Sequence, residues 1–154
     1  KTKGEMLVEN RNTDLITLLA TKTLSCSHGG GHTATWHNKY SLNCGYCIPC
    51  TIRRASIHKF NNSLDRCNDY GHRLKNEDIK ISSHEKRLDL LALAYFLNKN
   101  LTRAEVKREI KLMAKIDDIE EVTDMLLRGY AEIKQYINDK ADDEIKGLFS
   151  CQLA

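Results

Sequence analysis

The stretch that decides the fold is Cys44-Gly45-Tyr46-Cys47-Ile48-Pro49-Cys50, which places three thiols within seven residues. A CxxCxxC array directs its sulfurs toward one tetrahedral ion once the backbone turns back on itself. Gly45 suits the turn between the first two cysteines, because glycine adopts positive φ without a steric penalty. Pro49 presets its φ just before Cys50, where we expect a helix to begin. The array therefore predicts a metal site rather than three unliganded thiols.

A fourth thiol lies upstream at Cys26, and it would complete a closed Cys₄ shell around a structural Zn²⁺ ion. Imidazole also binds zinc, so a Cys₃His shell is the alternative. We predict the all-thiolate shell because it is a common closed structural site. The loop after Cys26 supplies the histidines of the alternative, which are His28, His32 and His37.

Composition narrows the possible classes of protein. With 154 residues, the chain can form one sizeable core, or one domain and an appendage. A net charge of +3 is too weak to indicate nucleic acid as a direct ligand. No apolar run is long enough to span a membrane, and no signal peptide is present. Cys67 and Cys151 stand apart from the cluster, which favours isolated thiols in a reducing cytosol and a cytoplasmic protein.

The first residue, Lys1, is not a methionine, and we take this as the mark of a fragment or a processed piece. Apolar residues at helical spacing predict helices over 3–10 and 13–20, with Asn12 or Thr13 as the cap of the second. A further helix is predicted over 50–61. We expect it to bury three residues, Ile52, Ala55 and Phe60, and to expose three others, Arg53, Arg54 and Lys59.

The pattern beyond residue 82 predicts three antiparallel helices that form a bundle. Capping boxes at 82–85 and 102–105 start the first two, and Asp117 or Asp118 caps the third. The first helix is expected to bury Leu88, Leu91, Ala92, Tyr95 and Phe96. The second is expected to bury Val106, Ile110, Met113 and Ile116. The third is expected to bury Ile119, Val122, Met125, Leu126, Ile133 and Ile137.

We therefore predict a mainly α protein, in which a zinc-stapled Cys₄ knuckle is followed by a helical bundle. The organisation is residues 1–62 with the knuckle, a connecting loop over 63–81, and the bundle over 82–154. We expect one apolar face of the bundle to dock onto a missing domain or a partner. The competing interpretation is a self-sufficient bundle that buries all of its apolar stripes.

A family resemblance follows from the order of these motifs. The run Leu24-Ser25-Cys26-Ser27, a Gly-containing loop and then Cys44-Gly45-x-Cys47-x-x-Cys50-x-x-Arg53 resembles the closing zinc motif of the 7-cyano-7-deazaguanine synthase family, the QueC-like enzymes. Thr2-Lys3-Gly4-Glu5 is similar to the segment that precedes this motif in the family. The stretch 48–55 looks closest to the QueC-like proteins of Qat-type anti-phage defence systems. The resemblance covers roughly residues 1–60 and leaves out the helical tail.

The resemblance implies that this chain is the C-terminal portion of an α/β ATP-pyrophosphatase parent. Such a parent is a ligase of queuosine-like biosynthesis, which activates a deazaguanine carboxylate with ATP before an amine attacks. The zinc would be structural, and Lys3 and Arg53 would lie near substrate or phosphate groups. The implied partner is a missing N-terminal ATP-binding domain or a partner subunit. No catalytic residue is assigned.

Two departures limit what the resemblance implies. Seventeen residues separate Cys26 from Cys44, more than the family usually has. The SGGxDS loop, whose backbone N–H groups would hold pyrophosphate, is absent from the sequence, so the chain alone is not expected to use ATP. The alternative function is a non-enzymatic, zinc-bearing adaptor whose helices bind a partner protein.

Overall fold

The computed structural model describes residues 1–20, 22–23, 25–27, 43–66, 70–75, 84–113 and 115–150. These residues form seven helices, α1 (Lys3–Glu9), α2 (Thr13–Ala20), α4 (Ile48–Phe60), α6 (His84–Asn98), α7 (Arg103–Met113), α8 (Ile119–Lys140) and α9 (Asp143–Ser150). Within the described ranges there is no β-strand, and a single parallel bridge joins Asn43 to Tyr70. The prediction of a mainly helical protein is confirmed.

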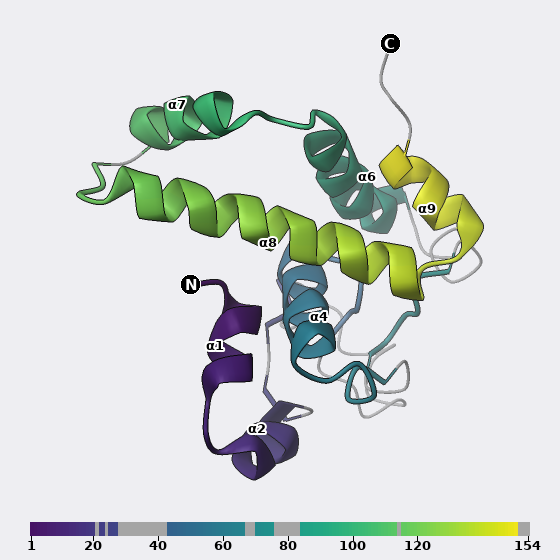
Figure 1. Cartoon of the computed structure of the whole chain (residues 1–154). Helices are drawn as coiled ribbons and strands as arrows, with labels where there is room; N and C mark the ends of the chain where they lie inside the picture. The colour runs from purple at the N-terminus through teal and green to yellow at the C-terminus, as the bar shows by residue number, and fades with distance from the viewer. Residues whose placement is uncertain are drawn as a thin grey trace.

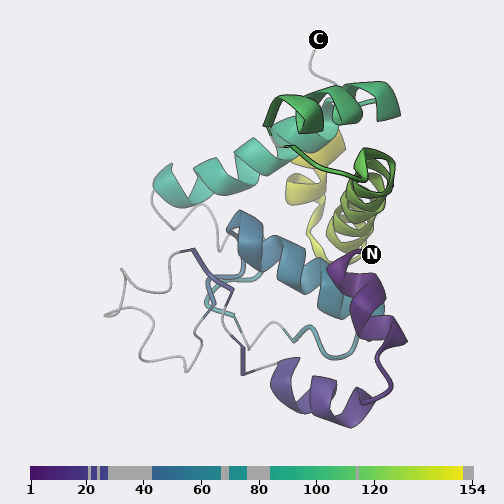
Figure 2. The same ribbon diagram turned by 90° about the vertical axis from the view of Figure 1, so that its left-hand side faces the viewer.

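The longest helix, α8, crosses the whole molecule (Figure 1). It packs against α4 on one side and against α7 and α9 on the other, while α6 contacts α9 and α4. Helix α1 packs along α4 and also contacts α8, since its Glu5 accepts from Arg128, and α2 is at the end of the molecule opposite α6 and α7 (Figure 2). None of the helices that the structure describes is both long and apolar enough to cross a bilayer.

One hydrophobic core joins the early and late parts of the chain. It is made of Ala55 from α4, Leu74 from the following segment, Ala141 between α8 and α9, and residues of α6, α8 and α9, namely Leu90, Leu93, Leu97, Ile133, Tyr136, Ile137 and Ile145. The tail helices therefore pack on α4 of their own chain as well as on one another. The division into 1–62, 63–81 and 82–154 stays a prediction, and residues from all three ranges share this core.

Helix α4 is buried on more sides than its sequence suggested. The prediction that Arg53 and Arg54 are exposed is wrong, since both are buried, and Ile52, predicted to be buried, is exposed. Ala55 is buried as predicted. The physical reason is that α4 has α1, α8 and the cysteine cluster around it, so even its cationic positions face protein.

Arg54 is held by an ion pair inside the protein. Its Nε and Nη2 donate to the Asp65 carboxylate at 3.1 and 3.2 Å, and its Nη1 donates to the Gly45 carbonyl at 3.3 Å. The guanidinium lies 4.3 Å from the centre of the Tyr70 ring and 5.4 Å from that of Tyr136. Burial by itself would lower the Arg54 pKa, but Tyr136 and the Asp65 carboxylate raise it above its ordinary value.

The predicted apolar stripe of α6 lies on the wrong face. Leu88, Tyr95 and Phe96 are exposed, whereas Leu90, Leu93, Ala94 and Leu97 are buried. The sequence of α6 is apolar on nearly every side from Leu88 to Leu97, so its periodicity alone could not select a face. The packing of α9 and α4 against one side makes that choice.

The other predicted helices agree better with the structure. Val106 and Ile110 of α7 and Ile133 and Ile137 of α8 are buried as predicted. Met113 at the end of α7 and Ile116 after it, also predicted to be buried, are exposed.

Side-chain caps set several helix starts. The Thr102 hydroxyl accepts from the Glu105 N–H at 3.3 Å, and the Glu105 carboxylate accepts from the Thr102 N–H at 2.8 Å, as a capping box requires. Asp118 caps α8, with its Oδ1 2.9 Å from the Glu121 nitrogen. The capping box predicted at 82–85 includes Ser82 and Ser83, which lie outside the described residues.

Removing one partner of the buried ion pair should destabilise the protein strongly. We expect Arg54→Met to lower the free energy of unfolding by about 3–5 kcal/mol, because Asp65 is left charged and unpaired inside the protein. Urea denaturation followed by circular dichroism measures the loss. Arg108→Met is the control, since Arg108 and its partner Glu109 are exposed, and it should change stability by at most about 0.5 kcal/mol. Equal effects of the two substitutions would contradict this account.

Candidate metal centre

Four cysteines meet where α4 begins. Cys44, Cys47 and Cys50 come from the turn and first residues of α4, and Cys26 comes from the segment after α2. Their four sulfur atoms all lie within 4.8 Å of one another. The side chains of Cys44, Cys47 and Cys50 are buried, and that of Cys26 is partly exposed. The structure thus brings together all four thiols that the sequence singled out.

The turn between Cys44 and Cys47 requires glycine at position 45. Gly45 has a φ of +90°, and a Cβ at this position would lie 2.5 Å from the His72 carbonyl oxygen and 3.0 Å from the Tyr70 Cβ. Tyr70 and His72 are so close because their segment runs beside the turn, where the His72 N–H donates to the Cys44 carbonyl at 3.1 Å. The predicted positive φ at Gly45 is confirmed.

Helix α4 starts at Ile48, two residues before the predicted start at Cys50. Cys47 is the N-cap residue, and its side chain makes no capping hydrogen bond, so its sulfur faces the other thiols. Pro49 lies in the first turn, where its missing N–H costs no helical hydrogen bond. The early start places Cys50 one turn into the helix, on the side of the cluster.

Hydrogen bonds among these cysteines set their acidity. The Cys44 N–H donates to the Cys26 sulfur at 3.3 Å, and the Cys47 N–H donates to the Cys44 sulfur at 3.2 Å. A hydrogen bond from the Cys44 thiol lowers the pKa of Cys26 to about 6. Hydrogen bonds from Cys26 and its neighbours also lower the pKa of Cys47, while those of Cys44 and Cys50 are raised. Within the cluster, Cys26 and Cys47 are therefore the thiols that ionise most readily.

The donor set and spacing fit a tetrahedral metal ion. Four sulfurs about 2.3 Å from a central zinc lie about 3.8 Å apart, and the Cys44 and Cys50 sulfurs are separated by 3.7 Å. Three of the four side chains are fully buried, so the shell has little access to water. The four cysteines could hold a metal ion, and an all-thiolate tetrahedral set suits zinc or iron. The alternative ligands His28, His32 and His37 lie outside the described residues.

Sequence reasoning missed the contribution of Asn43. Its buried side chain accepts from the Ser25 N–H at 3.0 Å and donates to the Thr23 carbonyl at 3.1 Å. These two bonds tie the segment that carries Cys26 to the residue before Cys44. In the sequence, Asn43 is marked only by its position directly before the cysteine array. That position does not reveal which backbone groups its side chain would bind.

Lys3 and Arg53, predicted to lie near substrate, line one cleft of about 450 Å³ between α1, α2 and α4. Lys3 is exposed at this cleft, whereas Arg53 is buried. The Arg53 guanidinium donates to the Ala20 carbonyl at the end of α2 and to the Thr23 hydroxyl. The structure therefore gives Arg53 a role in holding α2, and its role toward phosphate or carboxylate groups stays a prediction.

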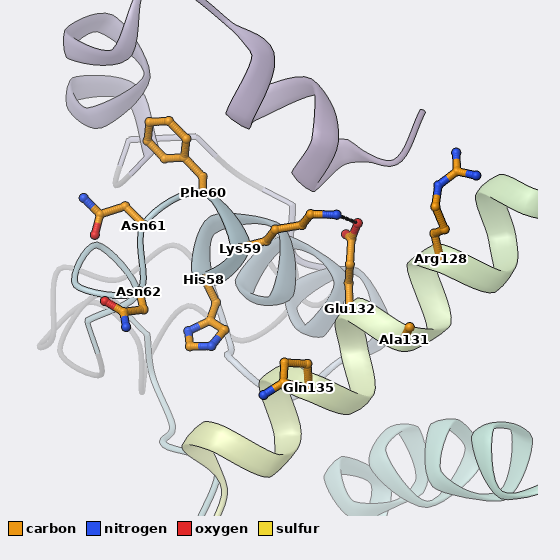
Figure 3. Close-up of a pocket in the computed structure, with 9 residues that line it drawn as sticks. All are labelled: His58, Lys59, Phe60, Asn61, Asn62, Arg128, Ala131, Glu132 and Gln135. Carbon is orange, nitrogen blue, oxygen red and sulfur yellow. Dashed lines mark hydrogen bonds and ion pairs between the residues drawn. The ribbon is translucent and has the colours of Figure 1, made fainter.

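A second cleft of about 700 Å³ lies between α4 and α8 (Figure 3). Its charged side chains are already paired, either with one another or with residues outside the lining. Lys59 pairs with Glu132 at 2.7 Å, and the His58 Nε2 lies 2.9 Å from Asp139. Arg128 donates to Glu5 of α1 at 2.7 Å, which together with the Thr2 N–H lowers the Glu5 pKa to about 2. These contacts fasten α1 and α4 to α8, and we assign no chemistry to this cleft.

Comparison of the chain with protein-family models, with curated proteins and with solved structures gives no match.

Alanine at position 45 should disturb the cysteine cluster. We expect Gly45→Ala to cost about 1–3 kcal/mol of stability, because alanine is strained at this φ and its Cβ would clash with the His72 carbonyl. We also expect it to weaken metal binding, measured by competition with a chromogenic chelator.

Gly147→Ala is the matched control, since Gly147 lies in α9 and nothing is within 4 Å of the added Cβ. It should stabilise the protein by about 0.5–1 kcal/mol. A stable, fully metal-binding Gly45→Ala protein would show that the turn is not required.

Proposed function

We propose that Cys26, Cys44, Cys47 and Cys50 hold one structural Zn²⁺ ion. The single observation that carries this proposal is the convergence of four sulfurs within 4.8 Å, three of them fully buried. Catalytic zinc sites keep an open position for water or substrate, whereas an all-protein shell of four thiolates is closed. Zinc therefore serves here to stabilise the fold.

Such an ion would stabilise the junction between the segment after α2 and the start of α4. Asn43 and Arg53 make polar contacts across the same junction. The Gly45 carbonyl of the same turn accepts from Arg54, so the metal site and the buried ion pair support each other. Because a site of this kind does not exist in the unfolded chain, the free energy of metal binding adds to folding stability.

We further propose that the chain is the C-terminal portion of a QueC-like, ATP-dependent enzyme that modifies a deazaguanine, in the manner of the anti-phage defence proteins it resembles. The support is the order of the Thr-Lys-x-Glu segment and the four cysteines. A further support is that Lys3 and Arg53 line the same cleft, whose lining includes Ser25, the residue before Cys26. An N-terminal domain or a partner subunit would supply the ATP-binding loop.

The second candidate function is a zinc-bearing adaptor without enzymatic activity. One observation favours it, since α2 is strongly apolar and yet has no buried residue, as expected of a surface that another protein covers. An SGGxDS loop encoded upstream in the same reading frame would favour the enzyme. Substitutions of the four cysteines cannot separate the two functions, because loss of the zinc would impair both.

Metal content tests the structural site. Purified protein should contain about one zinc ion per chain by mass spectrometry of the metals. Cys47→Ser should lose the metal and melt at a lower temperature, because only three thiolates remain. Cys67→Ser and Cys151→Ser are the controls and should keep the full content. Full zinc retention by Cys26→Ser would contradict the Cys₄ shell and indicate a histidine ligand, and iron in place of zinc would contradict the metal assignment.

ATP binding tests the assignment as a portion of a larger enzyme. Since residues 1–154 lack the SGGxDS loop, isothermal titration with ATP and Mg²⁺ should give no heat of binding at micromolar concentrations, and no pyrophosphate should be released. A P-loop ATPase serves as the positive control. Micromolar affinity of this chain for ATP would overturn the assignment, because the pyrophosphate loop would then not be missing.

A further inference from the structure

The cleft between α1, α2 and α4 has an apolar surface that the described part of the chain leaves uncovered. Its lining includes Met6 of α1 and Leu15 and Leu19 of α2, which are 59%, 46% and 42% exposed. Ile57 and Phe60 of α4 form its floor. Helix α2 buries no residue at all, although five of its eight residues are apolar. Large apolar side chains gathered at one cleft mark an interaction surface.

Exposed cations lie in the lining of this cleft and next to it in the sequence. Lys3 is a lining residue, Arg11 stands between the lining residues Asn10 and Asn12, and Lys22 precedes the lining residue Thr23. All three cations are exposed and, among the described residues, make no ion pair. The two glutamates of α1 are already occupied, since Glu5 pairs with Arg128 and Glu9 with Lys1. Asp14 is the one acidic residue of α2. An occupant that matches this surface must therefore be apolar on the side it buries and acidic along its edges.

Both walls of the cleft are held in place. The Arg53 guanidinium donates to the Ala20 carbonyl and to the Thr23 hydroxyl, and so fixes the end of α2 to α4. On the other side, α1 packs along α4, and Glu5 accepts from Arg128 of α8 at 2.7 Å. A partner would therefore meet a preformed surface, which reduces the ordering that binding costs.

We propose that this cleft binds an amphipathic α-helix of a partner protein, whose apolar stripe is flanked by glutamate or aspartate. An open groove between helices, with apolar walls that reach the solvent, is the shape into which such a helix lays its apolar face. A small ligand would leave Met6 and the outer side of α2 exposed, whereas a helix covers both. Among the described residues, none of the tail helices α6 to α9 lines this cleft.

Two fluorescent peptides of about 15 residues, with the same leucine stripe at i, i+3, i+4 and i+7, probe the cleft. One carries glutamate on both sides of the stripe, and the other carries lysine. Fluorescence anisotropy with the full chain at low salt measures both dissociation constants. We expect the glutamate peptide to bind at least about tenfold more tightly, with a difference that shrinks as salt is added. No binding of the glutamate peptide, or equal binding of both peptides, would overturn the proposal.

Substitutions then locate the peptide. Leu15→Asp and Leu19→Asp should each lower the affinity for the glutamate peptide by about tenfold or more. Lys3→Glu should reduce the preference for the glutamate peptide over the lysine peptide. Leu112→Asp and Met113→Asp on α7 are the controls, because these side chains are also exposed, by 76% and 85%, and lie outside the cleft.

Unchanged metal content and melting temperature show that each variant is folded, independently of the proposed enzyme function. Equal weakening by the α7 variants would assign the binding to non-specific hydrophobicity and overturn the proposal. Light scattering provides the last test. A dimer that Leu19→Asp abolishes, with no peptide bound, would assign the cleft to a second copy of this chain and overturn the proposal as well.

Discussion

The ion pair between Arg54 and Asp65 joins the parts of this protein that lie far apart in sequence. Its guanidinium contacts the Gly45 carbonyl in the cysteine turn, the Tyr70 ring beside that turn and the Tyr136 ring of α8. A buried cation is tolerated only when all of its partners are in place, so this network selects one arrangement of α4, the turn and α8. The core formed by α4, α6, α8 and α9 then surrounds one side of it.

The cysteine cluster depends on the same arrangement. Three of its thiols are local, since they belong to one turn and the first residues of α4. Cys26 comes from another segment, which Asn43 and Arg53 hold against them. In such a site the metal contributes folding free energy rather than chemistry. A reaction would need groups beyond the cluster, which is why the proposed enzyme function rests on a further domain and the cleft between α1, α2 and α4 offers a surface for a partner.

Local patterns predicted the helices well and their surroundings poorly. The bounds of α2 and the caps at Thr102 and Asp118 depend on hydrogen bonds within a few residues, so the sequence carries the full signal for them. The exposed face of α6 and the burial of Arg53 depend on which elements pack there. Periodicity cannot reveal this when a helix is apolar all round, or when a cation finds its partners at distant positions such as Ala20.

By itself, the sequence determined the four candidate ligands, the glycine turn and a mainly helical chain, because spacing and backbone conformation act locally. Only the tertiary structure decided that the tail packs on α4, that Arg54 lies at the centre with Asp65, and that α2 is left with its apolar side chains exposed. These outcomes depend on contacts between segments that a linear pattern does not relate. Their energies come from burial and from the pairing of charges away from water, which exist only once the chain has folded.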